Sequence, residues 1–297
     1  MLVFTQAWWL DAVCEDWDAV IVMNGETVKG AWAYPIERKM GVGLFRTPKL
    51  TPYTGPQVFY PADIKPAGRD GFEHDTIEEL LKQLPDIAVW NLALEPGLKQ
   101  AGIFSNHGLQ IQARQTFLLD LEPDETTLFA NFKDTTRRNI KLAEKECVIT
   151  AEPDSLPQLY QYHKHTLGKK EKGIAHAEKE MSLLLAAVIK NNAGSIHVAR
   201  QGGRIEGIAW YVWDARGCYF IMGARNPEAQ GHKAMSLLHW MAIKEAKKMG
   251  LQYFDFEGSM DAGVERFFRS FGGCRELYMV VHKNNSVLWK AKQSLMG

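Results

Sequence analysis

The sequence predicts an α/β (α+β) protein with a mixed sheet, and three observations carry that prediction. Asn24-Gly25 joins two runs of alternating apolar residues, which is a strong β-hairpin signal. From residue 125 onward, helices, an antiparallel meander, a long helix and further strands follow in the order of an α/β fold. Tyr253 to Glu257 alternates aromatic and acidic side chains with period two, which predicts a strand.

The N-terminal half predicts a first domain over residues 1–121. Glu122-Pro123-Asp124 follows its last strand and marks the boundary. Residues 41–72 are rich in Gly and Pro and predict one long loop, which in a compact domain is often functional. The other expected elements are a helix over 6–15, a strand over 19–23, a strand ending at Tyr34, a helix near 75–84, and strands near 86–94 and 109–121.

The second domain, over residues 122–297, has a clearer pattern. Expected helices cover 125–145, 155–167, 177–191, about 231–248, and a short stretch that Gly272-Gly273 ends; expected strands cover 147–151, 195–200, 204–213, 217–224, 253–257 and 277–282. The first half is a rougher copy of this order. We therefore expect two related domains with little sequence similarity, each a mostly antiparallel twisted sheet flanked by helices.

The composition is that of an ordinary globular protein, with 46% hydrophobic and 24% charged residues and a net charge of +0. The zero hides an asymmetry: residues 1–120 hold 10 basic and 15 acidic residues, whereas residues 121–297 hold 25 and 20. The basic half is the better place for an anionic ligand. The 4 cysteines lie far apart without a CxxC pair, which argues against a thiolate zinc site and a disulfide scaffold.

Signals for targeting, membrane insertion and metal binding are weak. The first basic residue is Lys29, so the N-terminus lacks the charged start of a signal peptide. The longest apolar run, Leu183 to Ile189, is too short to span a bilayer. We expect a cytoplasmic protein, for which peripheral contact with a membrane stays open. His163 and His165 would not face each other on a helix, so no metal site is predicted.

The strand end at Asp255 and Glu257 is the first candidate for chemistry. A carboxylate whose pKa is raised by a hydrophobic wall can accept the proton that an attacking amine loses, so both are candidate catalytic bases. The alternative is a carboxylate at a solvated strand end or one that caps the next helix. Ser259 follows as a substrate-orienting residue or as a plain helix cap.

Two further segments could bind anions. One opens a long helix, whose N-terminus attracts negative charge, although a plain helix start is equally consistent; it comprises Gln230, Gly231, His232, Lys233 and Ala234. The other is a basic stripe at helical spacing, formed by Arg137, Arg138, Lys141 and Lys145. Carrier phosphates, a tRNA or an anionic lipid head could use the stripe, but a charge run is commonly just a solvated face.

Two segments resemble the FemAB-like branch of the GNAT acyltransferase superfamily, which pairs two GNAT-type domains. One runs from Asn131 to Lys145 and is similar to the Arg-rich helix that opens the second domain in that branch. The other combines Asp255 to Ser259 with Phe267 to Gly272. The resemblance implies a degenerate first domain that shapes the acceptor site and a second domain that performs the chemistry.

The resemblance also implies an enzyme, an N-acyltransferase that moves an acyl or aminoacyl group from a carrier to an amine. The carrier would be coenzyme A or a charged tRNA, each a co-substrate rather than a tightly bound cofactor. The acceptor would be a small-molecule, peptide-linked or lipid-linked amine. Related folds splay their sheet, which here implies a cleft between strands 217–224 and 253–257. Met222 would then contact the donor, and Arg137, Arg138 and Phe268 the substrate.

Two departures from the GNAT pattern keep other functions open. GNAT enzymes that use coenzyme A carry Gln/Arg-x-x-Gly-x-Gly/Ala before the long helix, whereas Asn226 to Ala234 keeps one glycine and one small residue without that spacing. Many relatives place a tyrosine acid where this chain has Phe268, so an acid must come from elsewhere. One alternative is an aminoacyl-tRNA-dependent transferase of peptidoglycan peptide synthesis. Another is a non-catalytic sensor of an acyl carrier or lipid.

Overall fold

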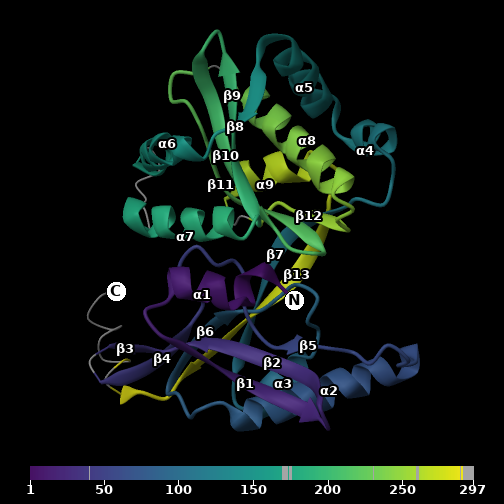
Figure 1. Ribbon diagram of the computed structural model, residues 1–297, viewed down its shortest axis with the longest axis vertical. Coiled ribbons are helices and arrows are strands. Elements are labelled where there is room, and N and C mark those ends of the chain that lie inside the picture. Colours follow the sequence, from purple (N-terminus) through teal and green to yellow (C-terminus); the bar gives the residue numbers. More distant parts are fainter. Residues whose placement is uncertain are drawn as a thin grey trace. The chain divides into compact units, whose positions relative to one another are not determined.

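The computed structural model describes residues 1–39, 41–168, 173, 176–229, 231–258, 261–287 and 289 (Figure 1). Its contacts divide the chain into two compact units, residues 1–114 with 277–297, and residues 115–276. The predicted α/β class is confirmed, because each unit contains a mixed, mostly antiparallel sheet with helices packed on it. In this division residues 277–297 belong with the N-terminal part of the chain, whereas the predicted boundary after Leu121 puts them in the second domain. The two predicted domains stay a prediction.

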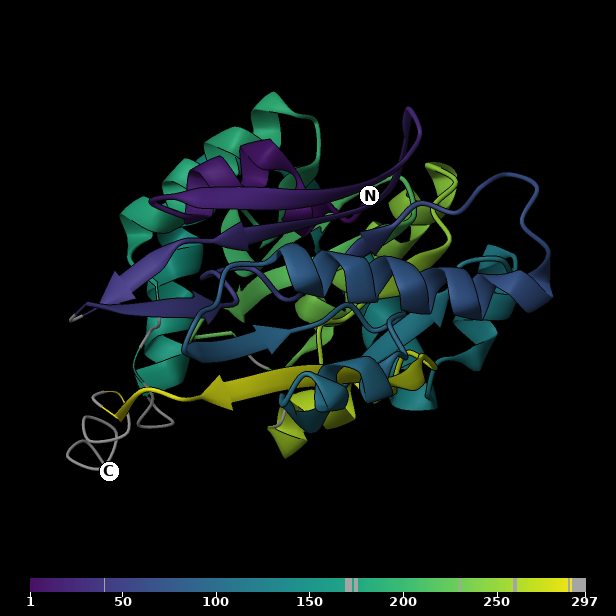
Figure 2. The same cartoon turned by 90° about the horizontal axis from the view of Figure 1, so that it is seen from below.

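A β-hairpin organises the first unit. Strands β1 (Trp17–Asn24) and β2 (Thr27–Pro35) pair antiparallel, and β5 (Gln57–Val58) extends this sheet along β2. Gly25 in the turn has φ of 61°, which glycine adopts without steric cost. The predicted hairpin is therefore confirmed. Helix α2 (Pro66–Gln83) packs against both hairpin strands (Figure 2).

The second sheet of this unit has the order β3 (Glu37–Lys39), β4 (Val42–Arg46), β6 (Val89–Ala93) and β13 (Cys274–Asn284). Strands β4 and β6 are parallel, and the other neighbours are antiparallel. The segments η1 (Val3–Thr5), α1 (Ala7–Val13) and α3 (Ala101–Asn106) complete the unit. The expectation of one long loop over 41–72 is partly wrong, because β4 and β5 lie within it and α2 begins at Pro66, where a missing N–H costs no hydrogen bond.

The sheet of the second unit has the order β7-β12-β11-β10-β9-β8. Its strands are β7 (Gln110–Asp120), β8 (Val148–Ala151), β9 (Gly194–Gln201), β10 (Arg204–Trp213), β11 (Gly217–Arg225) and β12 (Tyr253–Asp255). Its helical segments are α4 (Glu125–Asn131), α5 (Asp134–Glu146), η2 (Pro153–Ser155), α6 (Leu156–Gly168), α7 (Glu178–Lys190), α8 (Lys233–Lys248) and α9 (Ala262–Arg269). Figure 1 shows α5, α8 and α9 to one side of the sheet and α6 and α7 to the other.

The single helix expected over 125–145 is interrupted. Phe132 and Lys133 both have extended backbone, which ends α4 and starts α5. The N–H of Lys133 donates to the carbonyl of Ser270 over 2.9 Å, so the break is docked against the end of α9.

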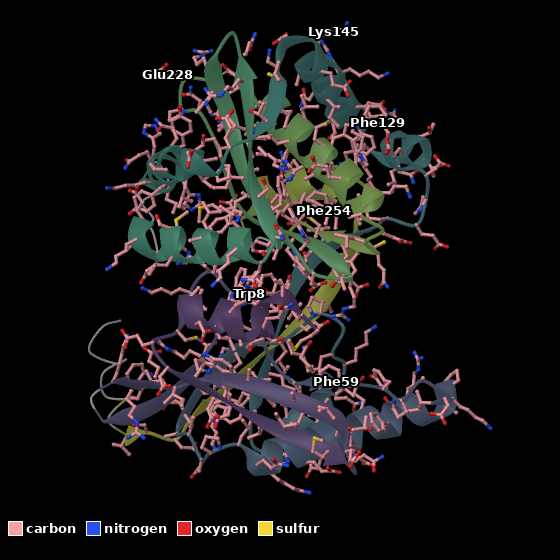
Figure 3. The ribbon with its side chains drawn as sticks, viewed as in Figure 1. Trp8, Phe59, Phe129, Lys145, Glu228 and Phe254 are labelled. Carbon is pink, nitrogen blue, oxygen red and sulfur yellow. The ribbon has the colours of Figure 1, made fainter. Side chains whose placement is uncertain are left out.

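The core beneath α8 is aromatic. Phe254, which is labelled in Figure 3, and Phe256 are fully buried there, and Phe117, Phe268 and Phe271 are buried with them. Burying one such ring stabilises the fold by roughly 1.5–3 kcal/mol. Because side chains alternate along a strand, Asp255 lies on the opposite face of the sheet. The sequence pattern thus predicted which residues of β12 are buried under the helices.

Candidate functional site

Strands β11 and β12 are paired over only three residues each. Gly217 to Tyr219 lie opposite Tyr253 to Asp255 in a parallel register, and β12 then ends while β11 continues to Arg225. The chain after Asp255 stays beside β7, since the N–H of Phe256 donates to the Phe117 carbonyl over 3.1 Å. The outer half of β11 therefore has no β12 residue beside it within the described chain, and the expected splay is confirmed.

A pocket of about 800 Å³ opens on this splay. Its walls come from α5, the end of α6, the outer half of β11, the start of α8, and α9. Concave sites of this size, apolar with a few convergent polar groups, are typical of small-molecule and cofactor binding. The pocket is therefore the candidate functional site of the second unit.

The lining combines apolar and cationic side chains. Its apolar members are Phe220, Met235, Val264, Phe267 and Phe268. Lys133, Arg225 and Arg266 are its cationic members among the described residues, and Asp261 is acidic. Asp261 already serves as a helix cap, because its Oδ1 accepts from the N–H of Gly263 over 3.0 Å. The pocket thus suits a ligand with an apolar portion and an anionic portion.

The predicted donor-binding segment only partly reaches the pocket. His232 precedes α8 and lines the pocket, and burial together with the charge of Arg225 lowers the pKa of its ring. Lys233 forms an ion pair with Glu146, and Ala234 is buried. Gly231 has φ of 75° and is exposed. Gln230 lies outside the described residues.

Met222 was expected to contact the donor from β11. It is buried and lies opposite Trp210 of β10, and it is not among the described residues that line the pocket. The residues of this strand that line the pocket are instead Phe220 and the stretch from Gly223 to Arg225. Which of these touches a donor stays a prediction.

The loop before α8 uses its own polar groups. The N–H of Glu228 donates to Oδ1 of Asn226 over 3.0 Å, and the N–H of Ala229 donates to the Asn226 carbonyl over 3.0 Å. Arg225 donates to the Ala229 carbonyl over 2.7 Å. Two N–H groups of the loop are therefore engaged internally rather than presented to a pyrophosphate.

The carboxylate of Asp255 ties the end of β12 to β7. Asp255 is 1% exposed, and its Oδ1 accepts from the hydroxyl of Thr116 and from the N–H of Glu257. Thr116 in turn accepts from the N–H of Gly258 over 2.9 Å. Sequence reasoning missed Thr116, since a single threonine in a strand gives no signal of its partner 139 positions away.

Glu257 occupies an unusual backbone and electrostatic position. Its φ is 48°, a left-handed conformation that is uncommon for glutamate. Its Oε1 is buried and has no hydrogen-bond donor among the described groups. Burial first, and then the charge of Asp255, raise the pKa of Glu257 well above its ordinary value. Strained backbone and perturbed carboxyls are typical of functional sites.

Glycine is required immediately after Glu257. A Cβ atom at Gly258 would lie 1.8 Å from the carbonyl oxygen of Gln115, so only glycine lets the chain pass this close to β7. Among the described residues that line the pocket, neither Asp255 nor Glu257 is present. The structure thus places both predicted bases beside the splay but off the pocket wall. Ser259 lies outside the described residues.

The predicted substrate contacts divide between two places. Phe268 is buried and lines the pocket. Arg137 and Arg138 line a separate shallow hollow of about 450 Å³ with Lys141 and Lys145. Arg137 is engaged with Asp134 and with the carbonyl of Ala130. Lys145 lies at the outer end of α5 (Figure 3).

His239 is a pocket residue that sequence reasoning missed. It lies on α8, is 0% exposed, and lines the pocket. Its Nδ1 is 3.2 Å from the hydroxyl of Tyr211, and burial lowers the pKa of the ring to about 3. A single histidine on the apolar face of a helix resembles any buried core histidine, so the sequence carried no signal for it.

The described chain offers neither a metal cluster nor a membrane span. In that part of the protein, no group of three or more His, Cys, Asp or Glu side chains could hold a metal ion. None of the helices defined there has the length and apolar character needed to cross a bilayer.

Residues 130–269 match the family model described as Acetyltransferase (GNAT) domain. This part of the chain is similar to GNAT domains, and the resemblance to the FemAB-like branch is confirmed at the level of the fold. No curated protein sequence matches the chain.

Solved structures share the fold over nearly the whole chain. FemX is similar with a TM-score of 0.72 at 10% identity, over 98% of this chain and 94% of that one. The C-terminal domain of a putative lysylphosphatidylglycerol synthetase from Agrobacterium fabrum gives a TM-score of 0.54 at 12% identity, over 90% and 84%. A tandem GNAT protein from the clavulanic acid biosynthesis pathway gives 0.52 at 12% identity, over 91% and 83%. At such identities the likeness shows a shared two-part GNAT fold.

Proposed function

We propose that the protein is an N-acyltransferase that moves a carrier-bound acyl or aminoacyl group to an amine, with the donor bound in the pocket at the β11–β12 splay. The observation that carries this proposal is the pocket itself. It opens where β11 leaves β12, and it is bounded by the start of a long helix within a GNAT domain. Its apolar rings would hold the acyl portion, and its cations the anionic carrier.

The reaction needs an aligned amine, a stabilised oxyanion and an acceptor for one proton. Positioning of two bound reactants can supply a large part of the rate. Glu257 remains the proposed base, and its raised pKa supports that role. Because Glu257 is off the pocket wall, the amine proton would reach it through a water molecule.

A matched pair of tryptophan substitutions tests the pocket. Val264 lines it, whereas Val148 on β8 is 67% exposed and is not among the described lining residues. The assay supplies acetyl-coenzyme A or aminoacyl-tRNA with a panel of amines and measures amide formation. We expect Val264→Trp to lower kcat/KM by about a hundredfold, since a small misplacement near the reaction centre has effects of that size. Val148→Trp should retain wild-type activity.

Three results are decisive for this proposal. Equal activity of Val264→Trp and wild type would show that the donor does not bind in the pocket. Saturable donor binding without amide formation by wild type would favour the sensor. Absence of both binding and turnover with either donor would reject the acyltransferase.

A second candidate, transfer from aminoacyl-tRNA in cell-wall peptide synthesis, is favoured by two observations. Two N–H groups of the loop before α8 are engaged internally, which disfavours the pyrophosphate of coenzyme A. The α5 hollow carries Arg138, Lys141 and Lys145 without acidic ion-pair partners in the described chain. Affinity for tRNA that falls steeply with salt would support this candidate, and no binding at low salt would end it.

A further inference from the structure

We propose that His239 is a catalytic residue of the donor pocket and that the N–H at its Nε2 binds the carbonyl oxygen of the donor. This inference rests on the proposed function and deepens it, because it names the group that meets the reacting carbonyl. It is carried by three features of the structure. They are the place of His239 in the pocket, its hydrogen bond with Tyr211 through Nδ1, and the absence of any polar partner for Nε2 in the described chain.

His239 is enclosed by aromatic rings. Ring centroids of Phe220, Phe267 and Phe256 lie 4.6, 5.5 and 5.7 Å from that of the imidazole. Phe220 and Phe267 line the pocket as well and are half-buried, so a ligand that displaces either ring gains access to the imidazole. A polar ring at the back of an apolar pocket is where a ligand carbonyl would be fixed.

The hydrogen bond to Tyr211 sets the tautomer. The Tyr211 hydroxyl is buried, and its polar neighbour is Nδ1 of His239, 3.2 Å away, in a pair whose donor depends on the tautomer of the ring. When the phenol donates its only hydrogen there, Nδ1 is the acceptor and the ring proton lies on Nε2. The lowered pKa, about 3, keeps the ring neutral with this single N–H.

In this tautomer the N–H at Nε2 of His239 is a hydrogen-bond donor without an acceptor in the described chain. It is buried, and no group of the described chain accepts from it. A buried donor without an acceptor is unfavourable, so residues of this kind are expected to have a function. The donor's carbonyl oxygen, which becomes negative during reaction, would satisfy it.

The chemistry balances without a proton from His239. The amine nitrogen attacks the carbonyl carbon and forms the C–N bond, and the C=O electrons move to the oxygen that Nε2–H stabilises. When the tetrahedral intermediate collapses, the bond to the carrier sulfur or oxygen breaks, and the amine's proton passes to the base and on to the leaving group. A neutral imidazole can act as the electrophile in this way. Phe268, with its ring centroid 6.1 Å from His239, cannot contribute a polar group.

Two His239 variants and a matched histidine control test the inference. His239→Phe removes the N–H at similar volume, whereas His239→Gln can return an N–H close to Nε2. His197 is also buried in this unit but is not among the described lining residues, so His197→Gln is the control. We expect kcat of His239→Phe to fall about a hundredfold or more, as for loss of one oxyanion donor. His239→Gln should recover at least part of it with KM little changed, and His197→Gln should match wild type.

Nitrogen-15 NMR of histidine-labelled protein gives a readout that a purely structural role would not move. The probes are acetonyl-coenzyme A, a ketone analogue of the thioester, and puromycin, an aminoacyl-nucleoside analogue. In the free protein His239 should show the Nε2–H tautomer, and a saturating probe should move that proton downfield while His197 stays unchanged.

The outcomes separate this inference from the proposed function. Turnover by wild type together with an unmoved Nε2–H and an unaffected His239→Phe would overturn the role of His239 and leave the function standing. A kcat limb near pH 6.5 that vanishes in His239→Gln would also overturn it, because a titrating histidine is not a fixed neutral donor. No binding of either probe and no turnover would overturn both.

Discussion

Thr116 on β7 donates a hydrogen bond to the carboxylate of Asp255 on β12, and both side chains are buried. The same pair receives the backbone N–H groups of Glu257 and Gly258 over 2.8 and 2.9 Å. The two side chains therefore replace sheet hydrogen bonds at the point where β12 ends. They hold Glu257 in its left-handed conformation and so fix the edge of the splay.

Loss of the Thr116 hydroxyl should loosen this edge. Thr116→Val removes the donor to the buried carboxylate of Asp255 and the acceptor for the partly buried N–H of Gly258. We therefore expect the free energy of unfolding to fall by about 1–3 kcal/mol. Urea denaturation monitored by fluorescence measures this. Thr126, which is exposed, provides the control, and Thr126→Val should stay within about 0.5 kcal/mol of wild type. Equal stability of both variants would show that the hydroxyl does not hold the strand end.

The carboxyl of Glu257 should make stability fall as pH rises. Its pKa is raised in the folded protein, so between the unfolded pKa, about 4.3, and the folded pKa the folded state holds the extra proton. The contribution of Glu257 to stability is therefore complete below about pH 4 and is lost progressively above it. We expect Glu257→Gln to be more stable than wild type at pH 8 and equal to it at pH 4, because glutamine cannot carry the buried charge.

Activity of the same variant tests the proposed base. If Glu257 accepts the amine proton, the rate of Glu257→Gln should be lower and its pH dependence flatter than in wild type. An unchanged rate across pH would show that Glu257 is not the base. A gain in stability without a change in rate would show that Glu257 has no catalytic role and that its buried carboxyl only destabilises the fold.

Local patterns predicted the parts of the fold that local chemistry decides. Asn24-Gly25 specified the hairpin, and the alternation from Tyr253 to Glu257 predicted β12 and its buried face, although β12 ends earlier than expected, at Asp255. The break at Phe132-Lys133 was missed because a tertiary bond from Lys133 to Ser270 stabilises it, and no local signal reports that bond. Helix α2 was expected too short, since Gly68 and Gly71 lower helix propensity but packing of the hairpin overrides them.

The site was predictable to a smaller extent. The strand end and the start of α8 could be found because a Gly-rich break and a helix start are local features. The pocket gathers residues from α5 to α9, and His239, one of its fully buried polar groups, lies on the largely apolar buried face of α8. Such a group becomes conspicuous only when its neighbours are known.

The basic stripe of α5 should matter only when the donor is a nucleic acid. Combined substitution Arg138→Ala and Lys141→Ala should weaken tRNA binding and reduce the slope of log affinity against log salt by about 1 for each phosphate that is no longer neutralised. Lys190→Ala with Lys248→Ala removes two exposed cations from other helices and serves as the control. Filter binding from low to moderate salt measures both. Identical slopes in the two variants would show that the stripe is only a solvated face.

The ion pair of Glu152 and Arg200 should support the edge of the second unit's sheet in neutral solution. Arg200 donates to both carboxylate oxygens over 2.9 and 2.6 Å, and these bonds lower the pKa of Glu152 to about 2. The stabilisation is present above the unfolded pKa, about 4.3, and is lost as pH falls towards 2. Because the pair is partly exposed, Glu152→Gln should cost only about 0.5 kcal/mol at pH 7 and less at pH 3. Unfolding curves at the two pH values would contradict this if the difference grew in acid.

A crystal structure of the protein soaked with acetonyl-coenzyme A or puromycin would show whether the β11–β12 pocket binds the donor carbonyl. We expect the carbonyl of one probe to lie between the outer half of β11 and helices α8 and α9, with its oxygen within hydrogen-bond distance of His239 Nε2. A probe bound at full occupancy elsewhere on the molecule, with the β11–β12 pocket empty and His239 still covered by Phe220 and Phe267, would contradict it.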